Sequence, residues 1–436
     1  MKKSLLIAAL ALGTLAANAE IVGGINYTLN SATKTAEITK TFEITYTGDL
    51  VVPSTITVSG TTYTVTSLGI EAFKSSELTS IVLPNTVTTL NRYAFNGSAL
   101  LKTITLGTGV TDIKANMIDG CTSLTDIYIN SSQAFSVSGA TFTQASAIRA
   151  NTNLHFASKA MIKSFLDAGG WNSFKMYMYP DMVCIDGVYY LANPADNTAK
   201  MLATYDVAAT DLGISQSALS GNAQQLGPDV NVAGTITVGG KEYTVTTLQA
   251  GAFYDTPNVT SVTLNEGLRN VEYETFYGTK VSEVVFPNSL ENLEHSNFYY
   301  CPNLTKVTFG TGFKTIGNNC FTNCAKLTDI TCLATVPPTQ AAGTSGNVFT
   351  AAVKSAVTLT VPYGTADLYK ASPVWSGFKA YVELPQGPGV GIEGVEVNQD
   401  APARYFSLQG VEINEPVKGQ MVIEVRGGKS VKRVIR

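Results

Sequence analysis

The sequence has few of the residues on which enzyme chemistry most often depends. Its 436 residues include only 2 histidines, His155 and His295. A Ser–His–Asp or Cys–His site could therefore be built in few ways. His155 falls in an apparent strand and His295 in a turn, so we expect both to be surface or partly packed side chains. The motifs G-x-S-x-G and H-E-x-x-H and the phosphate-binding glycine loop do not occur.

Charged residues are also scarce, at 14% of the chain with a formal net charge of −4. This mild acidity argues against a nucleic-acid partner, which usually requires a basic patch. Carboxylate pairs such as Glu272 and Glu274 could imitate a glycosidase site, but solvation of a repeat surface explains them more simply. We therefore predict that the protein is not an enzyme and has no catalytic residues, no cofactor and no metal site.

Long hydrophobic runs are absent except at the N-terminus. Two lysines there precede an apolar run from Leu5 to Leu15 and the small-residue site Ala17-Asn18-Ala19. This order is typical of a secretory signal peptide, whereas a membrane anchor needs about 20 apolar residues. We predict a signal peptide over residues 1–19 and no transmembrane segment after its cleavage. The protein would then be exported to the cell surface or the medium, with the periplasm as the alternative.

The sequence does contain a repeated pattern of apolar residues. Three copies in the first half follow one another at 23 residues, and four in the second half at 22, 23 and 23 residues. Their first residues are Leu78, Leu101, Leu124, Val259, Val281, Leu304 and Leu327, and each copy has further apolar residues three and five positions later. A coil of about 23 residues cannot bury its own apolar residues, but stacked coils align them into a shared core. The pattern predicts a β-rich solenoid, in which alternate strand residues point inward.

These copies resemble the BspA-like leucine-rich repeat, whose coils look like L-x-x-I-x-L-P-x-x-V-x-x-I-x-x-x-A-F. The resemblance is strong over about residues 50–130 and 234–335. It implies a surface-exposed or secreted bacterial protein, of the kind found in Bacteroidetes, that binds other proteins of a host or a neighbouring cell. It does not name the ligand.

Motifs at both ends of the repeat block occur twice in the chain. Residues 56–66 (ITVSGTTYTVT) match residues 236–246 (ITVGGKEYTVT), and residues 171–177 (WNSFKMY) match residues 375–381 (WSGFKAY). We therefore predict two tandem leucine-rich-repeat modules, residues 20–181 and 182–385.

Each module is expected to end in a cap built from a strand, a short helix and a second strand. The helices are expected from Ser158 to Asp167 and from Thr365 to Lys370. A terminal coil must cover the exposed end of the core, and the aromatic cluster around Trp171 or Trp375 suits that task. The alternative is an aromatic ligand site at these two tryptophans.

A Gly/Pro linker is predicted over residues 386–399, followed by a small β tail over residues 400–436. The tail carries Tyr405, Leu408 and Gly410, then Pro416-Val417-Lys418-Gly419 and Gly428-Lys429. It resembles the type IX secretion sorting domain of exported Bacteroidetes proteins, although Ser430 stands where that domain usually has a second lysine. The alternative is a β-hairpin cap with no role in sorting.

Five of the 6 cysteines take inward positions of the repeat, where a free thiol packs as a small hydrophobic group. They are Cys121, Cys301, Cys320, Cys324 and Cys332. Cys301 and Cys324 share one row on neighbouring coils, so a disulfide between them stays open at this stage. The spacing of Cys320 and Cys324 lacks the second ligand pair of a zinc site.

One row of residues points to a ligand site. The residue after the turn aromatic is Tyr254, Tyr277 and Tyr299 on three consecutive coils of the second module. Stacking of the coils would align these rings on the surface. They are either a packing row or a strip of amphipathic rings that binds a protein or a glycan.

The sequence as a whole favours an exported binding protein that acts through an extended solenoid face, most simply on a protein ligand. Two alternatives remain at this stage. One is a carbohydrate-binding protein of the envelope, which the tyrosine row and the low charge would also suit. The other is a structural spacer without a ligand.

Overall fold

The computed structural model describes residues 18–142, 145–202, 226–343 and 346–385, and the short segments 404–406, 412–413, 416–418, 421–426 and 429–434. The expected signal peptide, apart from Asn18 and Ala19, and the expected linker 386–399 lie outside the described residues. The chain divides into two compact units, Met1–Lys280 and Val281–Arg436. The predicted module boundary after Asp181 lies inside the first unit and stays a prediction.

The first unit begins with a 7-stranded sheet. Its strands are β1 (Asn18–Val22), β2 (Ile25–Asn30), β3 (Thr35–Ile38), β5 (Thr55–Val58), β6 (Thr61–Leu68), β8 (Thr89–Leu90) and β10 (Asp112–Ile113). β1, β2 and β3 pair antiparallel, as do β5 and β6. β3, β6, β8 and β10 pair in parallel, one strand from each successive coil.

A second, 6-stranded sheet of this unit is parallel throughout. Its strands are β4 (Thr47–Val51), β7 (Glu77–Val82), β9 (Thr103–Leu106), β11 (Asp126–Ile129), β12 (Asn153–Phe156) and β13 (Met176–Met178). Ile81, Ile104 and Ile127 are direct partners across β7, β9 and β11, and all three are fully buried. The inward register predicted from the repeat is therefore confirmed.

The rest of the first unit repeats this design. Its strands are β14 (Met182–Ile185), β15 (Val188–Asn193), β16 (Thr198–Met201), β17 (Asp229–Asn231), β18 (Thr235–Val238), β19 (Lys241–Leu248), β20 (Ser261–Thr263) and β21 (Asn270–Val271). An antiparallel start from β14 to β16 is again followed by parallel pairing of β16 with β19 and of β19 with β21. The burial pattern along β15 is the same as along β2.

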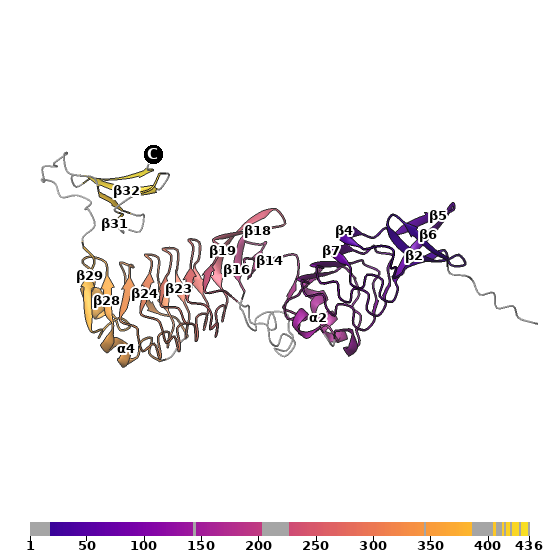
Figure 1. Cartoon of the computed structure of the whole chain (residues 1–436). Coiled ribbons are helices and arrows are strands. Elements are labelled where there is room, and N and C mark those ends of the chain that lie inside the picture. Colours follow the sequence, from indigo (N-terminus) through magenta and orange to yellow (C-terminus); the bar gives the residue numbers. More distant parts are fainter. Residues whose placement is uncertain are drawn as a thin grey trace, which may run out of the picture. The chain divides into compact units, whose positions relative to one another are not determined.

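The second unit continues with parallel coils. One 5-stranded sheet contains β22 (Glu283–Val285), β24 (Lys306–Phe309), β26 (Asp329–Cys332), β28 (Thr358–Val361) and β29 (Ala380–Glu383). Figure 1 labels β24, β28 and β29 of this sheet, in which β26 lies between β24 and β28. The shorter strands β23 (Asn292–Leu293), β25 (Thr315–Ile316) and β27 (Thr339–Gln340) form a second parallel ladder. The C-terminal strands β30 (Arg404–Phe406), β31 (Glu412–Ile413), β32 (Met421–Arg426) and β33 (Lys429–Val434) form an antiparallel sheet.

Helices are short and lie between strands near the end of each parallel sheet. They are the 3-10 helix η1 (Gly139–Thr141), α1 (Ser146–Arg149), α2 (Lys159–Ala168), α4 (Ala351–Ala356) and α5 (Ala366–Ala371). α2 follows β12 and ends at Gly169, whose φ of 93° is left-handed and stops the helix. α5 follows β28 after Thr365. None of the helices in the described part of the chain is long and apolar enough to cross a membrane.

The ends of both parallel sheets carry the same aromatic arrangement. Trp171 Nε1 donates to the Phe135 carbonyl at 2.8 Å, and the Tyr177 hydroxyl donates to the Trp171 carbonyl at 2.9 Å. In the second unit, Trp375 Nε1 donates to the Pro338 carbonyl at 2.7 Å, and a tyrosine again bonds the tryptophan carbonyl. Both indole rings are buried, at 1% and 0% exposure, so neither offers the ligand platform considered from the sequence.

Candidate binding surface of the repeat turns

The turns that contain the repeated aromatic residue form a hydrogen-bonded ladder of their own. Phe73 N donates to the Ala94 carbonyl at 2.8 Å, and Phe253 N donates to the Thr275 carbonyl at 2.8 Å. The aromatic rings behind this ladder stack face to face, with Phe253 and Phe276 5.2 Å apart at 13°. Each turn is therefore fixed to the next, and a side chain beside the aromatic ring takes a repeated position on the surface.

Left-handed residues stand two positions before and two positions after the turn aromatic. Around Phe276 they are Glu274 (φ 54°) and Gly278, and around Phe298 they are Ser296 and Tyr300 (φ 59°). Glycine adopts this conformation freely, whereas a side chain there costs about 1 kcal/mol. Glycine at several of these positions, such as Gly97 and Gly278, is the feature of the sequence that indicates a left-handed turn.

The structure brings two of the three predicted tyrosines into contact. The rings of Tyr254 and Tyr277 are stacked with centroids 4.6 Å apart and an angle of 10°, and both side chains are half-buried. Burial, the neighbouring Tyr277 and the carboxylates of Glu274 and Asp255 raise the pKa of Tyr254. The Tyr254 phenol therefore stays protonated at neutral pH and can donate or accept hydrogen bonds.

Tyr299, the third predicted tyrosine, lies in the second unit. Its ring meets that of Tyr300 edge to face at 4.7 Å, and Tyr300 is 51% exposed. Sequence analysis missed Tyr300 because it departs from the row that the repeat defines. The backbone at Tyr300 is left-handed, and the ring is exposed at a position where other coils have glycine, serine, aspartate or asparagine.

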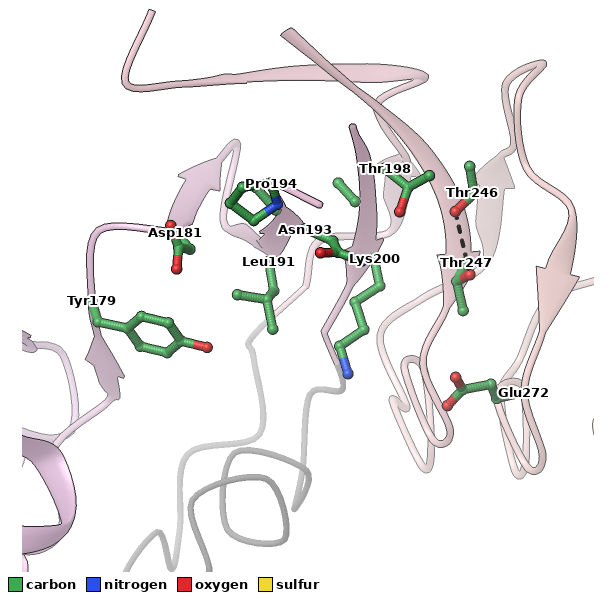
Figure 2. A pocket seen from close by; sticks show the side chains of 12 residues that line it. Tyr179, Asp181, Leu191, Asn193, Pro194, Thr198, Lys200, Thr246, Thr247 and Glu272 are labelled. Carbon is green, nitrogen blue, oxygen red and sulfur yellow. Dashed lines mark hydrogen bonds between the residues drawn. The ribbon is translucent and has the colours of Figure 1, made fainter. Parts of the chain in front are cut away.

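A second candidate is a pocket of about 460 Å³ in the first unit (Figure 2). It is lined by Tyr179, Asp181, Leu191, Ala192, Asn193, Pro194, Thr198, Ala199, Lys200, Thr246, Thr247 and Glu272. Figure 2 shows Lys200 extending through its middle, with Leu191 on one side and Glu272 on the other. The volume suits a small ligand, but such sites are usually lined by apolar groups. The lining residues come from four separate stretches of the chain, so no local sequence motif predicts this pocket.

The two histidines lie in different surroundings. His155 Nε2 is 2.7 Å from Asp126 Oδ1, and its ring stacks on Tyr128 at 4.2 Å. Burial alone would raise the pKa of Asp126, but hydrogen bonds from His155 and two neighbouring side chains outweigh it and lower that pKa. His295 Nδ1 is 3.3 Å from the hydroxyl of the adjacent Ser296. A histidine and a carboxylate are thus paired on β12 and β11. Asn153 donates to the same Asp126 oxygen, and Tyr189, which donates to Asn153, links this pair to the Cys184 thiol.

The cysteines predicted to face inward do so. Cys121, Cys301, Cys320, Cys324 and Cys332 are buried free thiols, and Cys184 is exposed. Cys121 Sγ donates to the Phe95 carbonyl at 3.1 Å, as the Ser98 hydroxyl does to the Phe73 carbonyl at 2.7 Å. Burial raises the pKa of Cys121 to about 12, so the thiol keeps its proton for this bond. Within the described ranges, no three His, Cys, Asp or Glu side chains are grouped so as to hold a metal ion.

The repeats match the family described as BspA type Leucine rich repeat region, in 6 copies over residues 55–164 and 242–342. No curated protein matches the chain. Similar solved structures include the pneumococcal vaccine antigen PcpA, at 14% identity over 84% of this chain and 99% of that chain, with a TM-score of 0.29. A leucine-rich repeat protein from Bacteroides ovatus has 14% identity over 84% and 90% of the two chains, with a TM-score of 0.28. The T. pallidum Leucine Rich Repeat protein has 14% identity over 73% and 83%, with a TM-score of 0.22.

Proposed function

We propose that this leucine-rich-repeat chain is an exported bacterial protein that binds a protein ligand of a host or neighbouring cell through its solenoid surface. The coils support this proposal because they present side chains at a repeated spacing on a rigid scaffold. A scaffold of this kind binds an extended partner without having to order itself first.

The observation that carries the proposal is the stacked pair of Tyr254 and Tyr277 in the first unit. Tyr299, in the second unit, is also proposed as a binding residue. The two rings are held by packed turns, are partly exposed and bear hydroxyl groups. Aromatic side chains with few rotatable bonds lose little entropy on binding and are common anchors of protein interfaces. Tyr300, 51% exposed beside Tyr299, extends the same chemistry.

Glycan binding is the alternative that the exposed ring of Tyr300 favours. Sugars pack against the flat face of an aromatic ring, and Tyr300 offers exposed ring surface. The stack of Tyr254 on Tyr277 favours a protein instead, because each ring uses one face on the other. A structural spacer without a ligand would not account for the partly exposed tyrosine rings on the repeat turns.

Export is part of the same proposal. A signal peptide over residues 1–19 would release a mature chain that begins at Glu20, and the tail 400–436 would act as a type IX sorting domain of a Bacteroidetes protein. The antiparallel sheet of β30 to β33 suits either this sorting role or that of a simple cap. The cell surface or the medium is the proposed location, and the periplasm is the alternative.

The proposal also keeps the two-module organisation, residues 20–181 and 182–385, each closed by its aromatic cap. The duplicated tryptophan hydrogen bonds at the ends of the two parallel sheets support it. We infer no catalytic, cofactor or metal site and no nucleic-acid partner, because the chain has few histidines, a mild net negative charge and none of the catalytic motifs searched for.

The test is a binding screen of the mature chain against protein and glycan arrays. The proposal predicts capture of a protein and loss of that signal when Tyr254 and Tyr277 are replaced by Ser. Tyr363→Ser serves as the matched control, because Tyr363 is 58% exposed and lies on a different segment. Capture of glycans alone would favour the alternative, and an equal signal from the tyrosine variant would move the site elsewhere.

A further inference from the structure

The turns after Phe253 and Phe276 form a surface that we call the acidic tyrosine face, made of Tyr254, Asp255, Glu274 and Tyr277. Asp255 N donates to the Tyr277 carbonyl at 2.8 Å, and Tyr277 N donates to the Glu274 carbonyl at 3.1 Å. The Asp255 carboxylate reaches over the next turn, since a Cβ added at Gly278 would lie 3.5 Å from its Oδ1. Both carboxylates are close enough to the Tyr254 ring, itself stacked on Tyr277, to contribute to the raised pKa of its phenol.

Neither of these two carboxylates is paired with a cation in the described part of the chain. Among the residues that the structure describes, neither Asp255 nor Glu274 forms an ion pair or a side-chain hydrogen bond. Asp255 is exposed and Glu274 is half-buried, so both are open to a partner. Within the described ranges, the face therefore carries two negative charges that no positively charged side chain neutralises.

The corresponding turns earlier in the chain show which kind of side chain pairs with a carboxylate beside an aromatic ring. Lys74, at the position of Tyr254 in its coil, pairs with Glu71. The Nζ of Lys74 also lies 5.9 Å from the ring centre of Tyr93 on the next turn. A lysine thus sits between a carboxylate and an aromatic ring of neighbouring turns, and Lys40 pairs with the same Glu71.

From this charge complementarity we infer that the acidic tyrosine face binds a lysine or arginine side chain presented by a basic segment of the protein partner. The inference rests on the proposed function and names the chemistry of its ligand. An ammonium or guanidinium group would pair with Asp255 and Glu274 and contact the phenol rings, as Lys74 does with Glu71 and Tyr93. Electrostatic complementarity of this kind sets the choice of partner and the association rate.

The test uses the mature full-length chain and a synthetic peptide of alternating lysine and glycine, with a glutamate–glycine peptide of the same length as the reference. Binding is measured by fluorescence anisotropy at low and physiological salt. Asp255→Asn with Glu274→Gln removes both charges and keeps the side-chain shapes. We expect roughly tenfold weaker binding of the lysine peptide by this variant, and a weaker dependence on salt.

The matched control is Glu77→Gln with Glu242→Gln, which removes the same net charge at two other exposed positions. This control is expected to bind the lysine peptide as the unchanged protein does. Equal losses in both double variants, or no binding of the peptide by the unchanged protein, would overturn the inference. Thermal unfolding of each variant shows that it is folded.

The protein captured in the array screen separates this inference from the proposed function. If the Tyr254 and Tyr277 serine variant loses that protein while the Asp255 and Glu274 variant keeps it, the tyrosines bind a protein but the basic segment is wrong. If both variants lose the captured protein, the proposed function and the basic segment are both supported. If both variants still bind the captured protein, the proposed tyrosine site and the basic segment are both contradicted.

Discussion

At the scale of single residues, one inward side chain in each strand joins a coil to its neighbours. Ile104 is fully buried and lies between Ile81 and Ile127 in register. Thr105, one position along, lies on the opposite face and is partly exposed. The alternation follows from the two-residue period of a strand, which is why the sequence alone predicted it.

Replacing Ile104 with Asp should therefore destabilise the protein strongly. A carboxylate would be buried against apolar neighbours, at a cost of about 3–5 kcal/mol. Thr105→Asp, on the outer face, should change the unfolding free energy by less than about 1 kcal/mol. Urea unfolding measures both, and equal midpoints for the two variants would contradict the register.

Asp126 is expected to make the free energy of unfolding depend on pH. Its pKa lies below the ordinary value of about 3.9, because hydrogen bonds from His155 and two neighbouring side chains outweigh the effect of burial. A carboxyl group with a lowered pKa stabilises the folded state above its ordinary pKa, and this contribution is lost as the pH falls through the lowered value. Asp126→Asn should therefore be less stable by about 1–3 kcal/mol at pH 7.

The difference between Asp126→Asn and the unchanged protein should shrink as the pH falls below about 4. Urea unfolding at several pH values between 7 and 2 measures it. A difference that stays constant over this range would show that the contact with His155 does not depend on the charge of Asp126.

At the scale of elements, the turns between strands are as closely fitted as the strands. Gly310 follows β24, and a Cβ added there would lie 2.3 Å from the Pro287 carbonyl oxygen of the preceding coil. Gly107, in the same place after β9, meets the Pro84 carbonyl oxygen at the same distance. Backbone on one coil therefore touches backbone on the next, and only glycine leaves the necessary room.

Gly310→Ala should force these two coils apart and destabilise the protein by several kcal/mol. Gly227→Ala is the control, since nothing lies within 4 Å of a Cβ added at Gly227 and its φ is not left-handed. That control should be neutral or stabilise by up to about 1 kcal/mol. Thermal unfolding compares them, and equal melting temperatures would contradict the close approach at Gly310.

The sequence predicted the main strand of each repeat, its inward residues and the extents of α2 and α5 to within a residue, because each depends on local patterns that recur along the chain. It did not predict the second ladder of short strands such as β23 and β25, or the helices α1 and α4. It did not predict the ladder of turns or the left-handed residues in it. Glycine, serine, asparagine, aspartate, glutamate and tyrosine all occupy these positions, so no single residue type marks them. The pocket around Lys200 was missed because its lining comes from separate segments.

The candidate site was predicted only in part, for a physical reason. A repeat places Tyr254 and Tyr277 one coil apart, so their stacking follows from the period. The positions of Asp255 and Glu274 beside these rings depend on the backbone conformation of the turn. Whether either carboxylate forms an ion pair depends on all the residues around it in the described structure. Such features emerge only when the coils are assembled.

At the scale of the whole molecule, the C-terminal tail should be separable from the repeats. We expect a chain that lacks residues 400–436 to melt within a few degrees of the full chain, because a Gly/Pro linker is predicted before the tail. If the tail directs sorting, the shortened protein should also accumulate in the periplasm. Fractionation of the producing bacterium tests this, and unchanged amounts at the surface or in the medium would leave the tail only a structural role.

The most direct test of the account is the affinity of the mature chain for the protein ligand that it captures, measured by surface plasmon resonance. The chain is compared with a variant in which Tyr254, Tyr277 and Tyr299 are all Ser. We predict at least about a tenfold loss of affinity, while the melting temperature falls by only a few degrees because one ring stack contributes about 0.5–1.5 kcal/mol. Full affinity in a variant that melts normally would contradict binding at the tyrosines. A much lower melting temperature of the variant would show that the three tyrosines stabilise the fold by packing instead.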